Sequence, residues 1–269
     1  MRRLVHISDP HFGRTRPELL EPLVARVNAA RADLVAVSGD LTQRARNRQF
    51  REARAFLDRL AAPWLAVPGN HDVPLDNLAR RLLSPWKRYR RWISWDLEPR
   101  FADAEMLVVG VNTVNPLSWQ RGRIGRSALA RAAAVLRADA APRVRVVVVH
   151  HPFEHLPGDS KAPMRGASRG IAGLAAAGAD VVLSGHLHTW RVGPFSAAPA
   201  GVGALQVHAG TGLSSRLRGE ENDFNVLTLA PDRIEVERVA APAGAADFET
   251  AGISAFVRTE AGWVRETAA

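Results

Sequence analysis

Short apolar runs alternate with longer amphipathic stretches along the first 190 residues of the chain. The Val146–Val149 run lacks polar alternation, which is typical of a strand buried on both faces. Alternating strands and helices predict an α/β fold in which helices cover a sheet. Predicted strands are Leu4–Ser8, Leu34–Ser38, Trp64–Val67, Leu107–Val111, Arg145–Val149 and Val181–Ser184. Predicted helices are Pro17–Arg31, Asn47–Leu60, Leu75–Trp92, Ser127–Asp139 and Ser168–Ala177, with Ser127 as an N-cap and Gly178 as a stop signal.

The pattern changes in the last third of the chain. Strands are predicted at Leu205–His208, Phe224–Leu229 and Ile234–Val239, and their short turns indicate a second, more antiparallel sheet. We therefore expect one domain over residues 1–239, with an insertion at 76–103, and a separate C-terminal segment over 240–269. That segment begins with an Ala- and Gly-rich linker and continues as a β-hairpin, Ile253–Arg258 and Trp263–Glu266, which turns at Ala261-Gly262. The hairpin either closes a sheet of its own chain or pairs with another subunit in a homo-oligomer.

Composition excludes several classes of protein. Of the 269 residues, 46% are hydrophobic and 23% are charged, which is ordinary for a globular chain and excludes extensive disorder. No apolar run approaches the ~18 residues of a membrane-spanning helix. The sequence has 0 cysteines, so it can form neither a disulfide scaffold nor a thiolate metal site. Because His6 interrupts a short apolar start, we expect no secretory signal and a cytoplasmic location.

Basic residues exceed acidic residues, with 36 Lys and Arg against 27 Asp and Glu. Most of this excess is expected to lie on solvated faces, but one cluster of Arg, Lys and Trp occupies residues 76–103. Three interpretations of this basic aromatic insertion stay open: a cap that packs its Trp side chains on the body, a lid whose Arg side chains bind anions, and a peripheral membrane face. A nucleic-acid partner is not favoured, because nothing resembles a stacking platform or a groove-reading helix.

Asp, Asn or His residues directly follow five of the predicted strands. In an α/β fold the carboxyl ends of the strands form the edge where ligands bind. Residues two apart in an extended segment point to the same side, so Asp9 and His11 can bind one ligand together, and so can His186 and His188. A single histidine of this kind is usually structural, but chance is a poor explanation of the whole set. The segments are Asp9-Pro10-His11, Gly39-Asp40, Gly69-Asn70-His71-Asp72, His150-His151 and Gly185-His186-Leu187-His188.

These side chains are the donors that a divalent metal site needs. Carboxylate, amide and imidazole groups suit Mn, Fe, Zn or Co and are poor ligands for Cu(I). The five segments offer more donors than the four ligands of a single tetrahedral zinc site. They fit two divalent ions that share a bridging carboxylate and leave open positions for water.

In order and in residue type, this set resembles the motifs of the calcineurin-like metallophosphoesterases over roughly residues 4–190. The resemblance implies two packed mixed β-sheets flanked by helices, an αββα sandwich. It also implies that Asp9, His11 and His188 hold the first metal ion. Asn70, His150 and His186 hold the second, and Asp40 bridges both. The Gly39-Asp40-Leu41-Thr42 segment and the chain length are similar to the bacterial branch that hydrolyses cyclic nucleotides and glycerophosphodiesters.

The resemblance further implies that His71 is not a ligand but contacts the phosphate and protonates the leaving oxygen. Asp72 is then a candidate to orient His71, and Asn70 and His151 are candidates for substrate binding. The position of His150 in the family pattern makes it the ligand, although a one-residue shift to His151 stays open. Four residues after a Gly-Thr-Gly turn either line the substrate rim or form a solvated loop, and we favour the loop: Ser214, Ser215, Arg216 and Arg218.

The expected function is therefore hydrolysis of phosphodiester bonds in cyclic nucleotides or other small phosphodiesters. Hydroxide shared by two divalent ions would attack phosphorus in line. An alternative is the same chemistry on a lipid-linked pyrophosphate, a phospholipid or a nucleic acid. A non-catalytic scaffold of this fold is least favoured, because every ligand position is filled.

Overall fold

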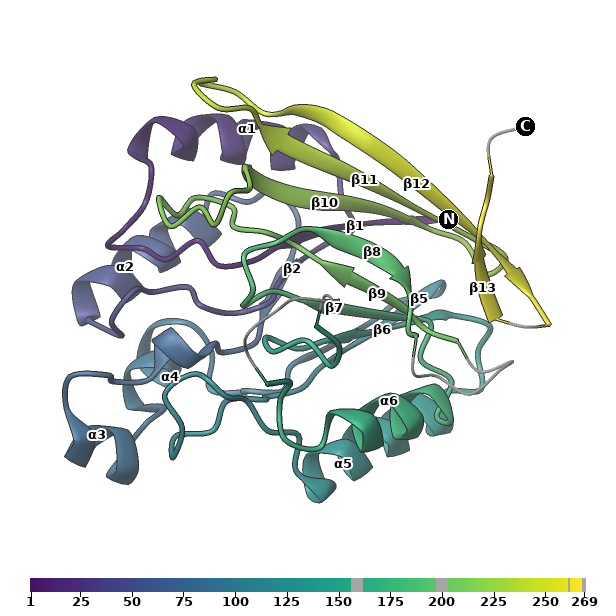
Figure 1. The fold of residues 1–269 in the computed structure, drawn as a ribbon, viewed down its shortest axis with the longest axis horizontal. Helices are drawn as coiled ribbons and strands as arrows, with labels where there is room; N and C mark the ends of the chain where they lie inside the picture. Colours follow the sequence, from purple (N-terminus) through teal and green to yellow (C-terminus); the bar gives the residue numbers. More distant parts are fainter. Residues whose placement is uncertain (156–161, 197–202, 261, 268–269) are drawn as a thin grey trace.

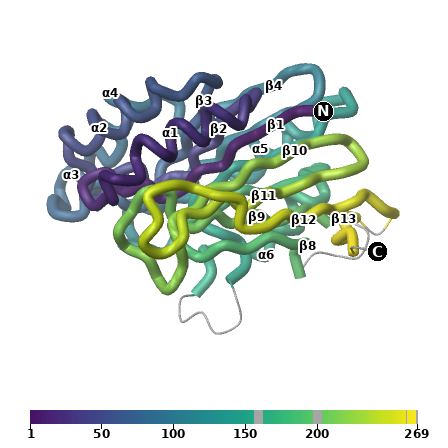
Figure 2. Tube along the Cα trace, turned by 90° about the horizontal axis from the view of Figure 1, so that it is seen from above, coloured from purple at the N-terminus to yellow at the C-terminus, as the bar shows by residue number. Residues whose placement is uncertain are grey.

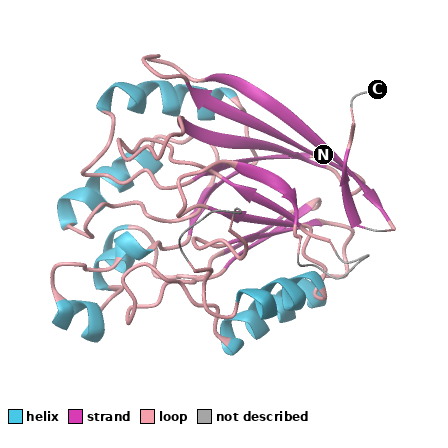
Figure 3. Ribbon diagram, viewed as in Figure 1, coloured by secondary structure: helices cyan, strands magenta, loops and turns pink. Residues whose placement is uncertain are grey.

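Two β-sheets pack face to face, and helices cover the outer face of each (Figures 1 and 3). The computed structural model describes residues 1–155, 162–196, 203–260 and 262–267. The predicted αββα architecture is confirmed. The helices are η1 (Pro17–Leu19), α1 (Leu20–Ala29), α2 (Asn47–Leu57), η2 (Asn70–Asp72), α3 (Leu78–Leu83), α4 (Lys87–Trp92), α5 (Arg126–Ala138) and α6 (Ala167–Ala175).

The first sheet has seven strands in the order β13-β12-β11-β10-β1-β2-β3. Its parallel part is β1 (Arg2–Ile7), β2 (Leu34–Val37) and β3 (Trp64–Ala66), and its antiparallel part is β10 (Asn222–Leu229), β11 (Arg233–Ala241), β12 (Glu249–Thr259) and β13 (Gly262–Arg265). The second sheet has six strands in the order β4-β5-β6-β7-β9-β8. They are β4 (Arg100–Ala102), β5 (Met106–Gly110), β6 (Val144–Val148), β7 (Val181–Ser184), β8 (Arg191–Pro194) and β9 (Leu205–His208).

Alternate residues of the central strands face different layers of the core. Val146 and Val148 pack between the two sheets, whereas Val147 and Val149 pack beneath α5 and α6. Because both faces of β6 are covered by apolar groups, its sequence shows no polar alternation. On the other side of the molecule α1 and α2 cover the first sheet (Figure 2). The sandwich therefore has three apolar layers, one between the sheets and one under each set of helices.

The predicted second, more antiparallel sheet was wrong. Instead, β9 joins the second sheet parallel to β7, while β10 and β11 extend the first sheet. This is because β2 pairs with only one edge of β1 and leaves the other edge for β10. The edge strands β4 and β8 were not predicted, since one is three residues long and the other contains Gly193 and Pro194.

Two helix predictions also need correction. The helix expected over 75–92 is split into α3 and α4, because Pro85 disfavours the helical conformation at Ser84. The N-cap of α5 is Gly125 and not Ser127. Gly178 follows α6 with a φ of 82°, as expected of a residue that ends a helix.

The predicted C-terminal hairpin is present as β12 and β13, and it pairs with β11 of its own chain. Ala261 of its predicted turn lies outside the described residues. Ala240 and Ala241, assigned to a linker by their composition, are buried at the end of β11. Phe256 and Trp263 pack between the sheets, so this segment contributes to the core. Within the described residues, no helix has both the length and the apolar character needed to cross a bilayer.

Candidate metal centre

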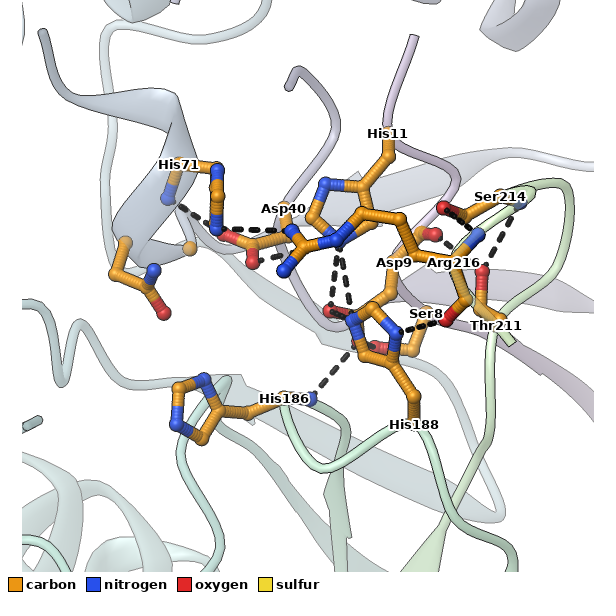
Figure 4. Close-up of polar contacts among 12 residues, drawn as sticks. Ser8, Asp9, His11, Asp40, His71, His186, His188, Thr211, Ser214 and Arg216 are labelled. Carbon is orange, nitrogen blue, oxygen red and sulfur yellow. Dashed lines mark hydrogen bonds and ion pairs between the residues drawn. The ribbon is translucent and has the colours of Figure 1, made fainter. Parts of the chain in front are cut away.

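The loops that follow β1, β2, β3, β6 and β7 converge, and the predicted ligands lie on them (Figure 4 shows part of this site). Parallel strands present their carboxyl ends at one edge of each sheet, and the packing of the sheets brings the two edges together. The structure buries all seven predicted ligands there: Asp9, His11, Asp40, Asn70, His150, His186 and His188.

One group of donors surrounds Asp9 Oδ1. This atom lies 3.1 Å from His188 Nε2 and 3.4 Å from His11 Nε2, and it forms no hydrogen bond with any described residue. His188 Nδ1 donates to the carbonyl of Arg216, so in the neutral ring Nε2 carries the lone pair. Electron-pair donors that face one another at this distance repel unless a cation lies among them. The donor set and the unpartnered carboxylate oxygen therefore fit a divalent metal ion.

Asp40 lies between this group and a second one. Its Oδ2 is 3.7 Å from His11 Nε2 on one side and 3.4 Å from His150 Nε2 on the other. His150 Nδ1 donates to the carbonyl of Ser38, which directs Nε2 into the site, 3.2 Å from Asn70 Oδ1. The His186 ring lies beside His150, with centroids 5.2 Å apart. One carboxylate oxygen thus faces imidazoles of both groups.

Electrostatics favour positive charge at this centre. Burial raises the pKa of Asp40, but His150 and His71 oppose it and hold that pKa well below its usual range. Burial alone would lower the pKa of His150, but the Asp40 carboxylate opposes this effect, and the pKa is raised to about 9. The buried carboxylates therefore attract a cation, whether a proton on an imidazole or a metal ion.

Several of these residues have a left-handed backbone conformation, with positive φ. This conformation is unfavourable for residues with a Cβ and is retained where the surrounding structure enforces it, as at functional sites. Two glycines let the loops approach closely: a Cβ at Gly69 would lie 2.1 Å from the Asp40 nitrogen, and one at Gly185 would lie 1.8 Å from Ser8 Oγ. The candidate ligands with a left-handed backbone are Asp9, His11, Asp40, His186 and His188, with φ between 49° and 71°.

A chain of buried hydroxyl groups supports Asp9 from below. Ser8 Oγ donates to Asp9 Oδ2, and Ser38 Oγ donates to Ser8 Oγ over 2.8 Å. His6 Nε2 lies 2.8 Å from Ser38 Oγ. These bonds engage Oδ2 and leave Oδ1 to face His11 and His188. These hydrogen bonds could not be predicted from the sequence, because a serine at the end of a strand has no distinctive spacing.

His71 lies beside the centre. Its Nδ1 donates to the carbonyl of Gln43 over 2.8 Å, so Nε2 faces the site. Arg216 Nη1 lies 3.3 Å from that Nε2, and Figure 4 shows the Arg216 side chain reaching across the site toward His71. The expectation that Ser214 and Arg216 belong to a solvated loop was wrong, because Ser214 is buried and Arg216 is half-buried.

Asp72 and His151 do not occupy the places expected of them. The Asp72 carboxylate accepts hydrogen bonds from the backbone nitrogens of Leu41, Thr42 and Gly69, so it joins two loops and does not orient the His71 ring. His151 has both ring nitrogens engaged within the protein, Nδ1 with Thr113 Oγ1 and Nε2 with the Gln120 carbonyl. Burial lowers the pKa of His151 to about 3. Between the two adjacent histidines, His150 is the one whose Nε2 faces Asp40.

Comparison with known proteins agrees with this geometry. Residues 2–190 match the family model of the calcineurin-like phosphoesterases, and the chain belongs to this family, as its motifs predicted. A glycerophosphodiester phosphodiesterase of Enterobacter lignolyticus, GpdQ, is 36% identical over 80 residues, which cover 26% of this chain and 29% of that protein. The His and Asp groups that the structure brings together are compatible with the binding of divalent metal ions.

Solved structures of other proteins share the fold. The purple acid phosphatase PPD1 from yellow lupin seeds has a TM-score of 0.66 at 15% identity, and the alignment covers 94% of this chain and 53% of that one. Vacuolar protein sorting 29 from Cryptosporidium parvum has a TM-score of 0.53 at 13% identity, with 95% and 98% covered. The chain therefore spans about half the length of the plant phosphatase, and its match to GpdQ spans under a third of that protein.

Proposed function

We propose that this chain is a binuclear, divalent-metal-dependent phosphodiesterase that acts on small phosphodiesters such as cyclic nucleotides or glycerophosphodiesters. The observation that carries the proposal is the position of Asp40 Oδ2 between His11 Nε2 and His150 Nε2. A single carboxylate oxygen between two sets of donors is what a pair of ions needs as a shared ligand. The match to GpdQ over 80 residues favours a diester over a monoester.

The ligands divide into two sets around Asp40. Asp9, His11 and His188 would hold one ion, and Asn70, His150 and His186 the other. When bound, two divalent ions (Mn, Fe, Zn or Co) would offset the negative charge of the phosphate and acidify a water molecule. The presence of all seven candidate donors, each of them buried, supports an enzyme over a non-catalytic scaffold of the same fold.

The remaining steps fall to side chains at the rim of the centre. His71 is fixed by the Gln43 carbonyl with Nε2 facing the site, where it can hold a proton for the leaving oxygen. The Arg216 guanidinium beside it can donate hydrogen bonds to a non-bridging phosphate oxygen. Both groups would act on the phosphodiester without a covalent enzyme intermediate.

Metal removal tests the proposal directly. We expect the purified chain to contain two divalent ions and to hydrolyse bis(p-nitrophenyl) phosphate faster than p-nitrophenyl phosphate. A chelator should abolish this activity and added Mn²⁺ should restore it, since the proposed nucleophile is a water molecule that the two ions acidify. Metal analysis of the chelated and reloaded protein provides the control. Undiminished hydrolysis by the metal-free chain, or a preference for the monoester, would contradict the proposal.

Replacement of Arg216 with Ala tests the predicted phosphate contact. A hydrogen bond to a charged group contributes about 1.5–3 kcal/mol, so we expect kcat/KM to fall about 10- to 100-fold. Most of the loss should appear in KM, because the contact is already made in the bound substrate. Arg218→Ala is the matched control, since Arg218 is exposed in the same loop. Equal effects of the two variants would show that Arg216 contributes only general charge.

A further inference from the structure

The basic aromatic insertion presents apolar side chains to solvent. Leu83 is 85% exposed and Trp95 is 80% exposed, and Leu78 and Leu82 on α3 are exposed as well. Isolated surface leucines are ordinary, but several large apolar side chains within 18 residues form a candidate binding surface. We call this surface, with α3, α4 and Trp95, the α3–α4 face.

The opposite side of the insertion is already packed. Tyr89 and Ile93 lie in the core beneath the first sheet, and the Tyr89 hydroxyl donates to the carbonyl of Ala66. Trp92 Nε1 donates to Asn47 Oδ1. The interpretation of the insertion as a cap therefore explains these inward residues. It does not explain Leu83 and Trp95, which point away from the body.

A buried arginine attaches a further apolar segment to this face. The Arg81 guanidinium donates to the carbonyls of Pro74, Pro116 and Ser118, and the ring of Trp119 lies 5.3 Å from its carbon. Leu117 and Trp119 of that loop are 81% and 60% exposed. The Arg81 side chain thus holds this loop against α3. Both the loop and α3 expose apolar side chains to solvent.

The charge of the face has one sign. Residues 77–95 contain six Arg and Lys residues and no Asp or Glu. Arg80, Lys87, Arg90 and Arg91 are exposed among the apolar groups. This surface combines exposed apolar side chains with basic residues, and residues 77–95 contain no acidic one. Such a surface is complementary to a bilayer interface that is apolar inside and anionic outside.

Two adjoining cavities in the α3–α4 face differ in the same two properties, charge and apolar character. A cavity of about 240 Å³ is lined by Arg80, Lys87, Arg88 and Arg91, whereas one of about 700 Å³ is lined by Leu83, Trp86 and Trp95 together with basic residues. They share walls at Ser84, Pro85, Lys87 and Arg91. A phosphate group suits the first cavity and acyl carbons suit the second.

We propose that the α3–α4 face docks on the anionic surface of a phospholipid bilayer. The apolar side chains enter the interface, and the basic side chains contact lipid phosphates. In both views α2, α3 and α4 lie together at one end of the molecule, with β13 at the other (Figures 1 and 2). The chain passes from His71 into this face within seven residues, so docking would place the metal centre near the membrane surface. The docking itself does not depend on the proposed function.

Vesicle co-sedimentation tests the proposal with the full chain. We expect the protein to sediment with vesicles of phosphatidylcholine and phosphatidylglycerol, to sediment much less with phosphatidylcholine alone, and to be released by salt. Leu83→Ser combined with Trp95→Ser should lower the apparent affinity about tenfold or more. Arg90→Glu combined with Arg91→Glu should lower it by at least as much, because four units of charge change at the anionic surface.

The controls carry the same substitutions elsewhere on the surface. Ile253→Ser removes an exposed apolar side chain from β12, and Arg137→Glu reverses an exposed charge on α5. Neither should change vesicle binding, and circular dichroism should show every variant folded. Binding that ignores lipid charge, or that the α3–α4 variants leave unchanged, would overturn the proposal. So would a protein that does not bind vesicles but forms a dimer dissociated by Leu83→Ser and Trp95→Ser.

Discussion

Asp40→Ala should reduce phosphodiester hydrolysis on the order of 10³-fold or more. The variant removes the carboxylate whose Oδ2 lies 3.7 Å from His11 Nε2 and 3.4 Å from His150 Nε2. Stabilisation by metal ions of the charge that develops at phosphorus contributes several kcal/mol, and each 1.4 kcal/mol is a factor of ten in rate. Steady-state kinetics on bis(p-nitrophenyl) phosphate, with metal content determined on the same sample, measure the effect.

A second variant separates loss of charge from loss of structure. Asp40 Oδ1 accepts a hydrogen bond from the His71 backbone nitrogen, and Asp40→Asn keeps an oxygen there while removing the charge. We expect Asp40→Asn to lose nearly as much activity as Asp40→Ala, because a neutral amide oxygen binds two cations poorly. Asp58→Ala, on the surface at the end of α2, should leave the rate unchanged. Full activity of metal-loaded Asp40→Ala would refute the two-metal proposal.

The convergence of the candidate ligands could be predicted because each of them is marked by the residues next to it in the sequence. Each of the segments that contain Asp9, Asp40, Asn70, His150 and His186 directly follows a run of apolar residues, and the carboxyl ends of parallel strands share an edge. The prediction needed the order of strand and polar residue, but it did not need the register between strands. The packing of two sheets then brought the edges together, as the family resemblance implied.

Other features depend on contacts between distant parts of the chain. Arg216 lies 145 residues from His71 in sequence, and the loop that carries it has no spacing that marks a site. The pairing of β10 with β1 depends on which strand edges stay free once β2 has paired. Asp72 follows His71 directly, yet its carboxylate turns to the backbone of Leu41 and Thr42. The position of Asp72 next to His71 in the sequence therefore did not predict its hydrogen bonds, which are made with the backbone of neighbouring loops.

His71→Ala should slow the hydrolysis of diesters with alkoxide leaving groups by about 10²- to 10⁴-fold, the range for loss of a general acid. The hydrogen bond from Nδ1 to the Gln43 carbonyl leaves Nε2 as the nitrogen that meets the substrate. Metal content should stay close to that of the unchanged protein, because the Nε2 atoms of His11, His150 and His188 still face Asp9 and Asp40.

The leaving group distinguishes proton transfer from phosphate binding. p-Nitrophenolate leaves without a proton, so His71→Ala should affect bis(p-nitrophenyl) phosphate far less than a glycerophosphodiester or a cyclic nucleotide. Arg216→Ala supplies the contrast, because a lost contact to a non-bridging oxygen should slow all of these substrates alike. Equal losses on aryl and alkyl diesters in His71→Ala would assign His71 to phosphate binding. The proton on the leaving oxygen would then have to come from a donor other than Asp72 or His151. The Asp72 carboxylate accepts hydrogen bonds from the loop backbone, and the His151 ring nitrogens contact Thr113 and Gln120.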